Sequence, residues 1–388
     1  MNLVITPKPL KGTVTPPPSK SLAHRALLAA FLAGETDPLP DLPDSQDILA
    51  TRQCLAALRE GKPMDCRESG STLRFLIPVS LALRHKGVFT GRGRLMERPQ
   101  TPYFDIFKEK NIAYTQENGV LTVKGALPPG DYRLPGGVSS QFVTGLLFAL
   151  PLVEGDSELI LTSPLESRGY VDLTLDVLEQ FGISLENQNY ERFLLSGQQR
   201  YRPCAYSVEA DWSQAAFWYA ANFVGCQVTL EGLNFDSAQG DKQAAALYWP
   251  MARPGDLDID LAHIPDLAPP LAAMAAVRRG VTRFVHAGRL RLKESDRIAA
   301  ITDALNALGA QAEETPDGFV VHGLPRLEGG GTVDCRNDHR IAMMAGVLAC
   351  CAQRPSTLLG AECVEKSYPQ FWAEFARLGG DSHVLALG

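Results

Sequence analysis

A polar cluster that leads directly into an apolar helix pattern occurs six times in this chain, and no other feature constrains the fold as strongly. The first cluster, residues 19–25, contains Ser19, Lys20 and Arg25 and runs into the apolar stretch at 26–34. The other five clusters occupy residues 69–74, 139–141, 211–214, 266 and 337–340. Because a helix start has unpaired N–H groups and the positive end of the helix dipole, Ser, Gly or Arg there suits an anion. Six such helix starts predict one shared anion-binding site.

Each cluster taken alone has an ordinary alternative interpretation, because Ser, Asn and Asp are the usual N-cap residues of helices. Capping does not account for the basic side chains Lys20, Arg25, Arg74 and Arg340, since a cation in the first turn opposes the helix dipole. The clusters as a set therefore favour anion binding.

A second helix pattern follows each cluster at a nearly constant distance. These second helices are predicted to begin near residues 44, 98, 167, 239, 293 and 366, which lie 25 to 29 residues beyond positions 19, 69, 139, 211, 266 and 337. Such regularity is typical of an internal repeat. Each repeat therefore contains a pair of helices.

The segments between these helix pairs differ in length. The long segments contain predicted pairs of strands at 113–115 with 120–123, at 183–188 with 192–195, and at 311–314 with 319–322. A full unit is thus predicted to run strand, helix, strand, helix, hairpin. The short segments 59–67 and 251–263 leave little room for the hairpin in units one and four.

We therefore predict an α/β fold of two similar lobes with three strand–helix units each and with shortened hairpins in units one and four. Residues 17–209 form one lobe, with units one to three. Residues 1–16 and 210–388 form the other, because a strand at 3–7 and the return of the chain near Ala210 indicate a two-strand connection. A cleft between the lobes, lined by helix N-termini, is the expected site.

Composition narrows the possible partners. With 388 residues, 45% of them hydrophobic, the chain has enough apolar side chains for two or three domains. Its net charge of −7 argues against nucleic-acid binding, so an anionic ligand must be attracted by a local cationic pocket. No apolar run approaches the roughly 18 residues of a membrane span.

The cysteines and histidines give no metal-binding pattern. The eight cysteines show no Cys-x-x-Cys spacing, the histidines show no His-x-x-x-His pair, and residues 2–10 contain no apolar signal core. We therefore expect a cytoplasmic protein with reduced thiols, a monomer without membrane or nucleic-acid partners and without a metal site.

Strings of residues in order along almost the whole chain resemble the 5-enolpyruvylshikimate-3-phosphate (EPSP) synthase family of enolpyruvyl transferases. They lie at 18–25, 91–99, 138–142, 264–266, 293–297 and 337–340. The family's fold consists of two lobes of three-fold repeated units, each lobe shaped like an inverse α/β barrel. That architecture agrees with the repeat predicted above.

The resemblance implies a reaction of the shikimate pathway that leads to chorismate and the aromatic amino acids. The enolpyruvyl group of phosphoenolpyruvate is transferred to the 5-hydroxyl of shikimate 3-phosphate, and phosphate leaves through a tetrahedral intermediate. No metal or organic cofactor is implied. Two phosphorylated, carboxylated substrates bring several negative charges, which the cationic helix starts are suited to bind.

The resemblance also implies which residues bind shikimate 3-phosphate. They are Lys20, Ser21, Arg25, Ser139, Ser140, Gln141, Ser167, Tyr170, Asp266, Arg289 and Lys293. Ser21 and Arg25, which lie four residues apart and so face one side of a helix, match positions that hold the shikimate carboxylate. Ser139, Ser140, Ser167 and Lys293 match the phosphate-binding positions.

For phosphoenolpyruvate the resemblance implies a clamp made largely of cations. Its members are Lys20, Gly70, Arg98, Gln141, Arg297, Arg340 and Lys366. Asp266 and Glu294, with Lys20 as a third group, are the implied catalytic residues, Asp266 as proton acceptor and Glu294 as the acid that protonates the methylene carbon. Arg297 has the alternative of pairing with Glu294 on its own helix, and Asp266 alone has the alternative of an N-cap.

Two positions depart from the family pattern, because Glu68 and Arg289 each stand where many members have asparagine. The sister enzymes that use UDP-N-acetylglucosamine have asparagine after the first lysine and a cysteine in a mobile loop. Here Ser21 follows Lys20, and residues 92–102 contain no cysteine. A non-catalytic anion-binding protein is the other alternative, suggested by the short units but disfavoured by the presence of all the catalytic and clamp residues.

Overall fold

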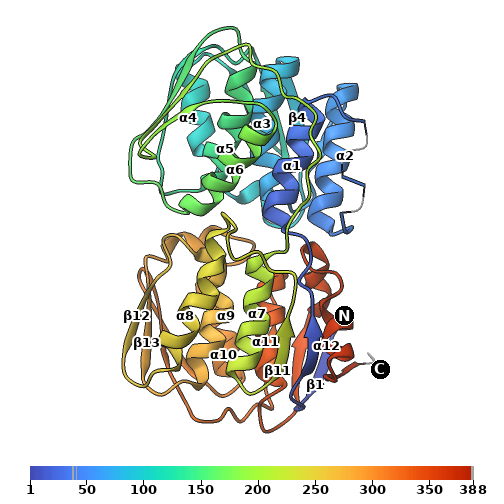
Figure 1. Ribbon diagram of the computed structural model, residues 1–388, viewed down its shortest axis with the longest axis vertical. Coiled ribbons are helices and arrows are strands. Elements are labelled where there is room, and N and C mark those ends of the chain that lie inside the picture. The colour runs from blue at the N-terminus through green and yellow to red at the C-terminus, as the bar shows by residue number, and fades with distance from the viewer. Residues whose placement is uncertain (37–38, 41, 386–388) are drawn as a thin grey trace. The chain divides into compact units, whose positions relative to one another are not determined.

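The computed structural model describes residues 1–36, 39–40 and 42–385, and the chain divides into two compact units (Figure 1). The central unit is Pro18–Val208, and the discontinuous unit combines Met1–Pro17 with Glu209–Gly388. In the discontinuous unit the two parts of the chain meet where the backbone N–H of Asp211 donates to the carbonyl of Pro17, at 2.8 Å. No helix in the described ranges is long and apolar enough to cross a membrane.

The central unit contains six α-helices and two four-stranded sheets in its described residues. The helices are α1 (Lys20–Leu32), α2 (Gln46–Glu60), α3 (Gly70–Arg84), α4 (Thr101–Glu109), α5 (Ser140–Ala149) and α6 (Arg168–Gln180). One sheet has the order β3 (Met64–Asp65), β4 (Lys86–Thr90), β6 (Val120–Lys124), β5 (Ala113–Glu117). The other has the order β7 (Gly130–Leu134), β8 (Ser157–Leu161), β10 (Arg192–Leu195), β9 (Glu186–Gln188).

The discontinuous unit has its own helices, α7 (Trp212–Phe223), α8 (Gln243–Ala252), α9 (Ala268–Val277), α10 (Arg297–Ala307), α11 (His339–Ala349) and α12 (Phe371–Arg377). Its four-stranded sheets have the orders β12 (Leu257–Asp260), β13 (Val281–Val285), β15 (Gly318–His322), β14 (Gln311–Thr315) and β16 (Thr332–Asp334), β17 (Ser356–Leu359), β1 (Leu3–Thr6), β18 (Asp381–Val384). A two-stranded sheet joins β2 (Lys11–Val14) to β11 (Gln227–Leu230) in parallel.

All four four-stranded sheets share one topology. Two parallel strands separated by a helix are followed by two antiparallel strands, as in β3–β4 with β6–β5. In the sheet where β16 and β17 are the parallel pair, the N-terminal strand β1 pairs antiparallel with both β17 and β18. The pairing of β1 explains why the N-terminus belongs to the discontinuous unit.

The predicted helices and strands are confirmed within one turn at most positions. The first helices of the pairs begin at the polar clusters, and the three predicted hairpins are β5–β6, β9–β10 and β14–β15. Segments 59–67 and 251–263 are fully described, and neither contains a hairpin. Their strands β3 and β12 instead pair in parallel with β4 and β13, the next strands along the chain.

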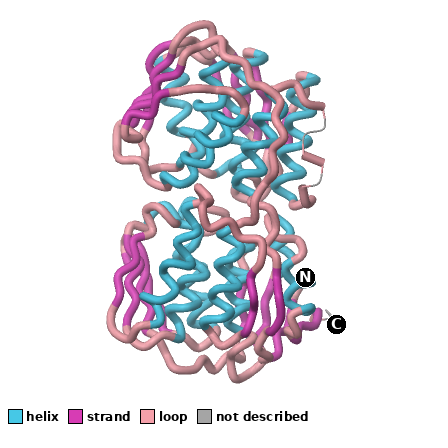
Figure 2. The backbone as a smooth tube through the Cα atoms, in the orientation of Figure 1, coloured by secondary structure: helices cyan, strands magenta, loops and turns pink. Residues whose placement is uncertain are grey.

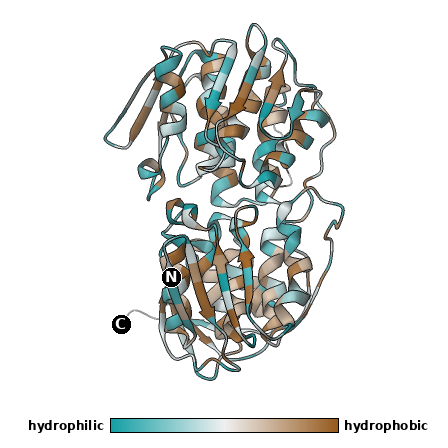
Figure 3. Ribbon diagram, turned by 90° about the vertical axis from the view of Figure 1, so that its left-hand side faces the viewer, coloured by the Kyte–Doolittle hydropathy of each residue, from teal (hydrophilic) through white to brown (hydrophobic). Residues whose placement is uncertain are grey.

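Helices fill the interior of each unit, and strands lie toward its outside (Figure 2). Every residue of α11 is buried, and nine of the ten residues of α9 are buried. Such helices are apolar on all sides, as expected for helices enclosed by other elements. Hydrophobic residues accordingly concentrate on the strands and inner helices, with hydrophilic residues in the connecting turns (Figure 3). A buried helix that begins at a polar cluster carries charged side chains, such as Arg340, into the interior.

Candidate functional site

The polar side chains at five of the six clusters cap their helices. Ser19, Ser69, Ser139, Asp211 and Asp338 each accept a hydrogen bond from a backbone N–H two or three residues ahead. The capping interpretation is therefore correct for these five side chains. It is wrong for Asp266, which lies inside the short 3₁₀ turn Pro265–Leu267 and directs its carboxylate to cations instead.

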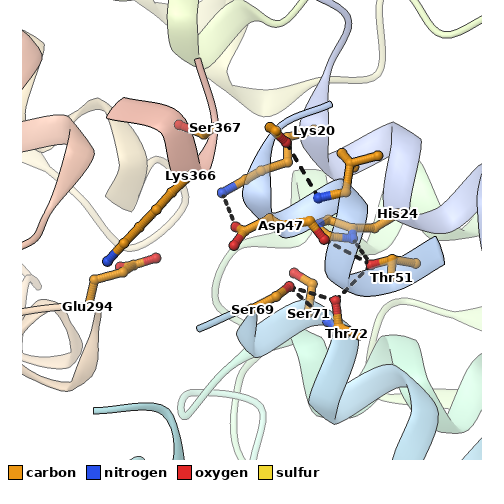
Figure 4. A network of polar contacts seen from close by, with 12 residues as sticks. Lys20, His24, Asp47, Thr51, Ser69, Ser71, Thr72, Glu294, Lys366 and Ser367 are labelled. Carbon is orange, nitrogen blue, oxygen red and sulfur yellow. Dashed lines mark hydrogen bonds and ion pairs between the residues drawn. The ribbon is translucent and has the colours of Figure 1, made fainter. Parts of the chain in front are cut away.

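In the central unit, Lys20 forms an ion pair with Asp47 at the start of α2 (Figure 4). The Lys20 Nζ and Asp47 Oδ2 atoms are 2.9 Å apart, and the two side chains are only 16% and 13% exposed. The carboxylate lies in the first turn of α2, where the helix dipole favours negative charge. Asp47 was not predicted, because no sequence pattern indicates which carboxylate faces Lys20.

A chain of hydrogen bonds links the starts of α1, α2 and α3 (Figure 4). The Nδ1 atom of His24 lies 2.7 Å from the Thr51 hydroxyl, which lies 2.7 Å from the Thr72 hydroxyl, which donates to Ser69 at 2.7 Å. Burial, with the nearby cations Lys20 and Arg25, lowers the pKa of His24 well below its ordinary value. His24 is therefore neutral at pH 7 and acts as a structural link between the helix starts.

Arg25 is 2% exposed and is held by neutral oxygens. Its Nε donates to the Thr174 hydroxyl at 2.8 Å, and its guanidinium also donates to the carbonyls of Ser21 and Tyr170 at 2.6 and 2.8 Å. Burial lowers the pKa of Arg25 to about 10, which leaves it charged at pH 7. Because these partners carry no formal charge, the positive charge of Arg25 is available to attract an anion.

Gln141 is oriented by two neighbours on α3. Its side-chain carbonyl accepts from Arg74 Nη1 at 2.8 Å, and its amide donates to the Ser71 hydroxyl at 3.0 Å. Arg74 also lies over the ring of Phe142, with 4.6 Å between the guanidinium carbon and the ring centroid. Arg74, singled out in the sequence only as a cation at a helix start, is thus a positioning residue for Gln141.

Arg98 packs directly on the backbone of Gly70. A Cβ atom at Gly70 would lie 2.7 Å from Arg98 Nη1, closer than a side chain at that position allows. Arg98 is 8% exposed, and its buried Nε has no hydrogen-bond partner among the described residues. The absence of a side chain at Gly70 therefore fixes where the guanidinium of Arg98 lies.

The serine positions predicted to bind phosphate lie at the starts of α5 and α6. Ser140 and Ser167 are 7% and 3% exposed, and Ser139 caps α5. Ser167 has φ of +57°, a left-handed backbone conformation that costs a residue with a side chain about 1–2 kcal/mol. Such strain is often found at ligand-binding positions. Tyr170, one turn into α6, contributes its carbonyl to Arg25.

In the discontinuous unit, Arg297 is enclosed by carboxylates and is 1% exposed. Its guanidinium lies 2.9 Å from Asp338, 2.6 Å from Glu294 and 3.2 Å from Asp266. Burial alone would lower the pKa of Arg297, but these three carboxylates raise it above its ordinary value. The predicted alternative for Arg297, a pair with Glu294, is confirmed, and two further carboxylates share the same guanidinium.

Asp266 is surrounded by cations. Its carboxylate lies 2.9 Å from Arg340, 3.2 Å from Arg297 and 3.8 Å from Lys293. Burial alone would raise the pKa of Asp266, but Arg340, Lys293 and Arg297 together hold it well below its usual value. Asp266 is therefore an ionised carboxylate at any physiological pH.

The other predicted cations of this unit are Lys293, Lys366, Arg340 and Arg289, and they contact both the Asp266 carboxylate and neutral groups. Burial lowers the pKa of Lys293 to about 8, an effect that Asp266 partly opposes. Lys366, 7% exposed, donates to the carbonyl of Asn337 at 2.6 Å. Arg340 also donates to the Ser213 hydroxyl at 3.1 Å, and Arg289 donates to the carbonyl of Ala262.

The predicted site residues thus form two groups, one in each unit. The central unit holds Lys20, Ser21, Arg25, Gly70, Arg98, Ser139, Ser140, Gln141, Ser167 and Tyr170. The discontinuous unit holds Asp266, Arg289, Lys293, Glu294, Arg297, Arg340 and Lys366. Asp47, Asp338 and Thr174 hold the predicted cations in place but were missed. Only Asp338 had a sequence signal, since it lies within the string at 337–340.

Comparison with known proteins identifies close relatives. The family model described as EPSP synthase (3-phosphoshikimate 1-carboxyvinyltransferase) matches residues 4–62 and 59–375. The chain is 43% identical to the 3-phosphoshikimate 1-carboxyvinyltransferase of Clostridium acetobutylicum, with 100% of each chain covered. It is 42% identical to the protein of the same name from Clostridium kluyveri, with 99% of each chain covered.

Solved structures show the same fold. The structure of EPSP synthase from Acinetobacter baumannii matches with a TM-score of 0.77 at 24% identity, covering 98% of this chain and 99% of that one. The enolpyruvyl transferase NikO from Streptomyces tendae matches with a TM-score of 0.77 at 17% identity, covering 98% of both chains.

Proposed function

This chain belongs to the EPSP synthase family, and from that premise we propose that it transfers the enolpyruvyl group of phosphoenolpyruvate to the 5-hydroxyl of shikimate 3-phosphate. The observation that carries the proposal is the 43% identity to a 3-phosphoshikimate 1-carboxyvinyltransferase over the whole of both chains. The buried cations at the helix starts support it, because both substrates are multiply charged anions.

For shikimate 3-phosphate we assign the carboxylate to Ser21 and Arg25 and the phosphate to Ser139, Ser140, Ser167 and Lys293. The charge of Arg25, held by neutral oxygens, supports the first assignment. The strained backbone of Ser167 and its position before α6 support the second. Gln141, Tyr170, Arg289 and Lys20 complete the contacts.

For phosphoenolpyruvate we assign Arg98, Arg340 and Lys366 as the principal cations, with Gly70, Gln141, Lys20 and Arg297 beside them. Arg98 is supported by its buried Nε, which lacks a partner among the described residues. Arg297 is assigned on the resemblance alone, since its N–H groups already bind three carboxylates. Arginine forks suit the bidentate binding of phosphate and carboxylate groups.

The addition step of the proposed reaction needs two proton transfers, and the elimination step needs C3 to return its proton. As the 5-hydroxyl oxygen bonds to C2 of phosphoenolpyruvate, it loses its proton to a base, and C3 gains a proton to become a methyl group. The C2–O bond to phosphate then breaks, and C3 returns a proton. Asp266 is the proposed base, because it is ionised and only 17% exposed. Glu294 or Lys20 is the proposed acid at C3.

The cations around Asp266 predict that its basicity rises when substrate binds. In the free protein Arg340, Lys293 and Arg297 hold its pKa low, which makes it a weak base. Anionic substrate groups that bind Arg340 and Lys293 weaken the stabilisation of the ionised Asp266 carboxylate by these cations. The pKa of Asp266 then rises toward the range useful for proton transfer. Substrate binding and activation of the base are thereby coupled.

We also propose that each of the two compact units is an inverse α/β barrel of three strand–helix repeats. Counted along the whole chain, repeats one and four lack their hairpins. The common topology of the four-stranded sheets supports this, as does the two-stranded sheet of β2 and β11. The alignment with the Clostridium acetobutylicum protein runs over 430 positions against 388 residues here, so that relative has segments with no counterpart in this chain. We expect a cytoplasmic monomer.

The test is release of inorganic phosphate from phosphoenolpyruvate by the purified full-length chain. We expect release that requires shikimate 3-phosphate, together with formation of EPSP detected by mass spectrometry. UDP-N-acetylglucosamine is the control acceptor and should give none. Equal phosphate release without shikimate 3-phosphate, or release only with the control acceptor, would overturn the proposal.

A further inference from the structure

Three cysteines from distant parts of the sequence form a compact triangle in the discontinuous unit. The Sγ atom of Cys226 lies 3.7 Å from that of Cys350 and 3.7 Å from that of Cys351, and the last two are 3.8 Å apart. Among the described residues this is the one group of three or more His, Cys, Asp or Glu side chains whose ligand atoms are close enough to share a metal ion. Nothing in the proposed transferase reaction uses it.

The dimensions of this triangle match those of a thiolate metal site. Zn–S bonds are about 2.3 Å long, so two sulfurs of a tetrahedral site lie about 3.8 Å apart. The point in the plane equidistant from the three sulfurs lies about 2.2 Å from each, so a small cation at or just above the plane reaches all three. The sulfurs therefore need little movement to become ligands.

The elements around the triangle hold it in place. Cys226 lies between α7 and β11, and its sulfur accepts a hydrogen bond from the backbone N–H of Leu10 at 3.2 Å. Cys350 is the C-cap of α11, which packs against α7 (Figure 1). Two helices thus end beside the triangle, and the negative ends of their dipoles favour a bound cation.

One side of the triangle is accessible. Cys226 and Cys350 are 6% and 0% exposed, whereas Cys351 is partly exposed and lines a cavity of about 460 Å³ with Phe223, Val224 and Gly225. Gly225 has φ of +117°, a conformation that favours glycine, and its missing side chain leaves room beside the Cys351 sulfur. The cavity provides an entry path and space for a water as fourth ligand.

We propose that Cys226, Cys350 and Cys351 form a binding site for a thiophilic cation with a filled d shell, Zn²⁺ or Cu⁺. Soft thiolate ligands select such ions over Mg²⁺ or Ca²⁺. Binding releases thiol protons, including the one that Cys350 donates to the carbonyl of Val347 at 3.0 Å. The proposal departs from our expectation of no metal site, because 124 residues separate Cys226 from Cys350 and no spacing motif marks them.

The site is structural and lies apart from the proposed chemistry. Cys350 follows the last residue of α11, and His339 and Arg340 begin that helix, about 16 Å away along its axis. A metal ion there would fasten the C-terminal ends of α7 and α11 and the adjoining sheet of β2 and β11. Bound metal should therefore raise the thermal unfolding temperature, and the rise should continue as the free metal concentration increases beyond the dissociation constant.

The test is titration of the reduced, metal-stripped full-length protein with Zn²⁺, with Cd²⁺ as a spectroscopic substitute, and separately with Cu⁺, each against a chromophoric chelator. We expect one ion per chain, ultraviolet thiolate-to-Cd²⁺ charge-transfer absorption and a higher unfolding temperature. Cys351→Ser should lower the affinity by about 100-fold or more, since even residues behind a ligand cost 10- to 100-fold. Cys204→Ser, also at a partly exposed cysteine, is the matched control and should change nothing.

Two outcomes would overturn the proposal. One is the absence of stoichiometric binding of either Zn²⁺ or Cu⁺ by the folded protein. The other is binding that Cys351→Ser leaves unchanged, which would place the metal elsewhere. Because Cys351 is partly exposed, its serine variant should fold, and circular dichroism without metal verifies this. Cys226→Ala provides an independent second variant with the same expected loss. Neither result depends on whether the chain releases phosphate from phosphoenolpyruvate.

Discussion

The contact between Gly70 and Arg98 gives a sharp test of how the proposed phosphoenolpyruvate clamp is positioned. In Gly70→Ala the new methyl group would lie 2.7 Å from Arg98 Nη1, 3.1 Å from Cζ and 3.2 Å from Nη2. An ordinary contact needs roughly 3.5 Å or more, so the guanidinium must move by about 1 Å. Because the atoms that clash are the far end of a flexible side chain, the backbone of α3 can remain where it is.

A displacement of that size has a predictable kinetic effect. Misplacing a substrate-positioning group by about 1 Å can cost up to 10²-fold, so we expect the KM for phosphoenolpyruvate to rise by about 10- to 100-fold. The KM for shikimate 3-phosphate should change little, since none of its proposed contacts touches the new methyl group. Urea unfolding should give an unchanged midpoint, because no core atom is displaced.

A double-mutant cycle separates this mechanism from direct steric exclusion of the ligand. Steady-state phosphate release is measured for Gly70→Ala, Arg98→Ala and the double variant. If the methyl group acts through Arg98, Gly70→Ala should reduce kcat/KM for phosphoenolpyruvate only slightly in the Arg98→Ala background. The cycle then gives a coupling energy of about 1 kcal/mol or more. An equal loss from Gly70→Ala in both backgrounds would refute the reasoning and indicate that the methyl group meets the substrate itself.

Three further predictions concern charge. Because the pKa of Lys293 is about 8, kcat/KM for shikimate 3-phosphate should fall above pH 8 as the ammonium deprotonates, and Lys293→Arg should move the decline to higher pH. Lys293 itself does not cause unfolding in this range. Because its pKa is lower in the folded state than in the unfolded state, its contribution to the free energy of unfolding increases as pH rises above 8. Arg340→Ala should raise the KM for phosphoenolpyruvate, whereas Glu294→Gln should lower kcat by about 10²-fold or more; near-normal kcat would remove Glu294 from the mechanism. The resemblance implies that Glu68 stands beside the phosphoenolpyruvate site, so Glu68→Asn should tighten phosphoenolpyruvate binding, because like charges at about 4 Å repel by roughly 1 kcal/mol in water. Unchanged or weaker binding in an equilibrium titration would contradict this.

The helix starts could be predicted from sequence because their signals are local. An apolar stretch behind Ser19 or Asp338 fixes both a helix and its cap within a few residues. Glu294, three residues from Arg297, could be predicted as its partner, but ion-pair partners from other segments could not, because they depend on tertiary packing. Lys20 meets Asp47, 27 residues away, and Arg297 meets Asp338, 41 residues away.

The same limit explains why the N-cap alternative for Asp266 fails and why the thiol triangle was unexpected. A lone aspartate before an apolar helix is usually a cap, but three cations from other segments draw the Asp266 carboxylate away from the helix start. Cysteines 226 and 350 are brought together by the packing of α7 on α11. Spacing motifs in a sequence detect metal ligands that lie within one segment. They do not detect ligands that packing brings together from distant segments.

Asp338 holds the buried cation Arg297, and its removal should show how much stability that pair contributes. Its carboxylate is fully buried, accepts from Arg297 at 2.9 and 3.3 Å and from the Ser295 hydroxyl at 3.0 Å, and caps α11 through the N–H of Arg340. In Asp338→Asn one oxygen becomes an amide NH₂ group, which cannot accept from Arg297, so a buried guanidinium loses part of its compensation.

Loss of one partner from a buried ion pair costs about 3–5 kcal/mol, whereas an exposed pair is worth about 1 kcal/mol or less. We therefore expect Asp338→Asn to lower the free energy of unfolding in urea by about 3 kcal/mol or more at an unchanged m-value. Asp303→Asn, which breaks the exposed pair of Asp303 with Arg336 in the same unit, is the matched control and should cost far less. A similar small loss for both variants would mean that Glu294 and Asp266 alone neutralise Arg297, and that Asp338 serves mainly as a helix cap.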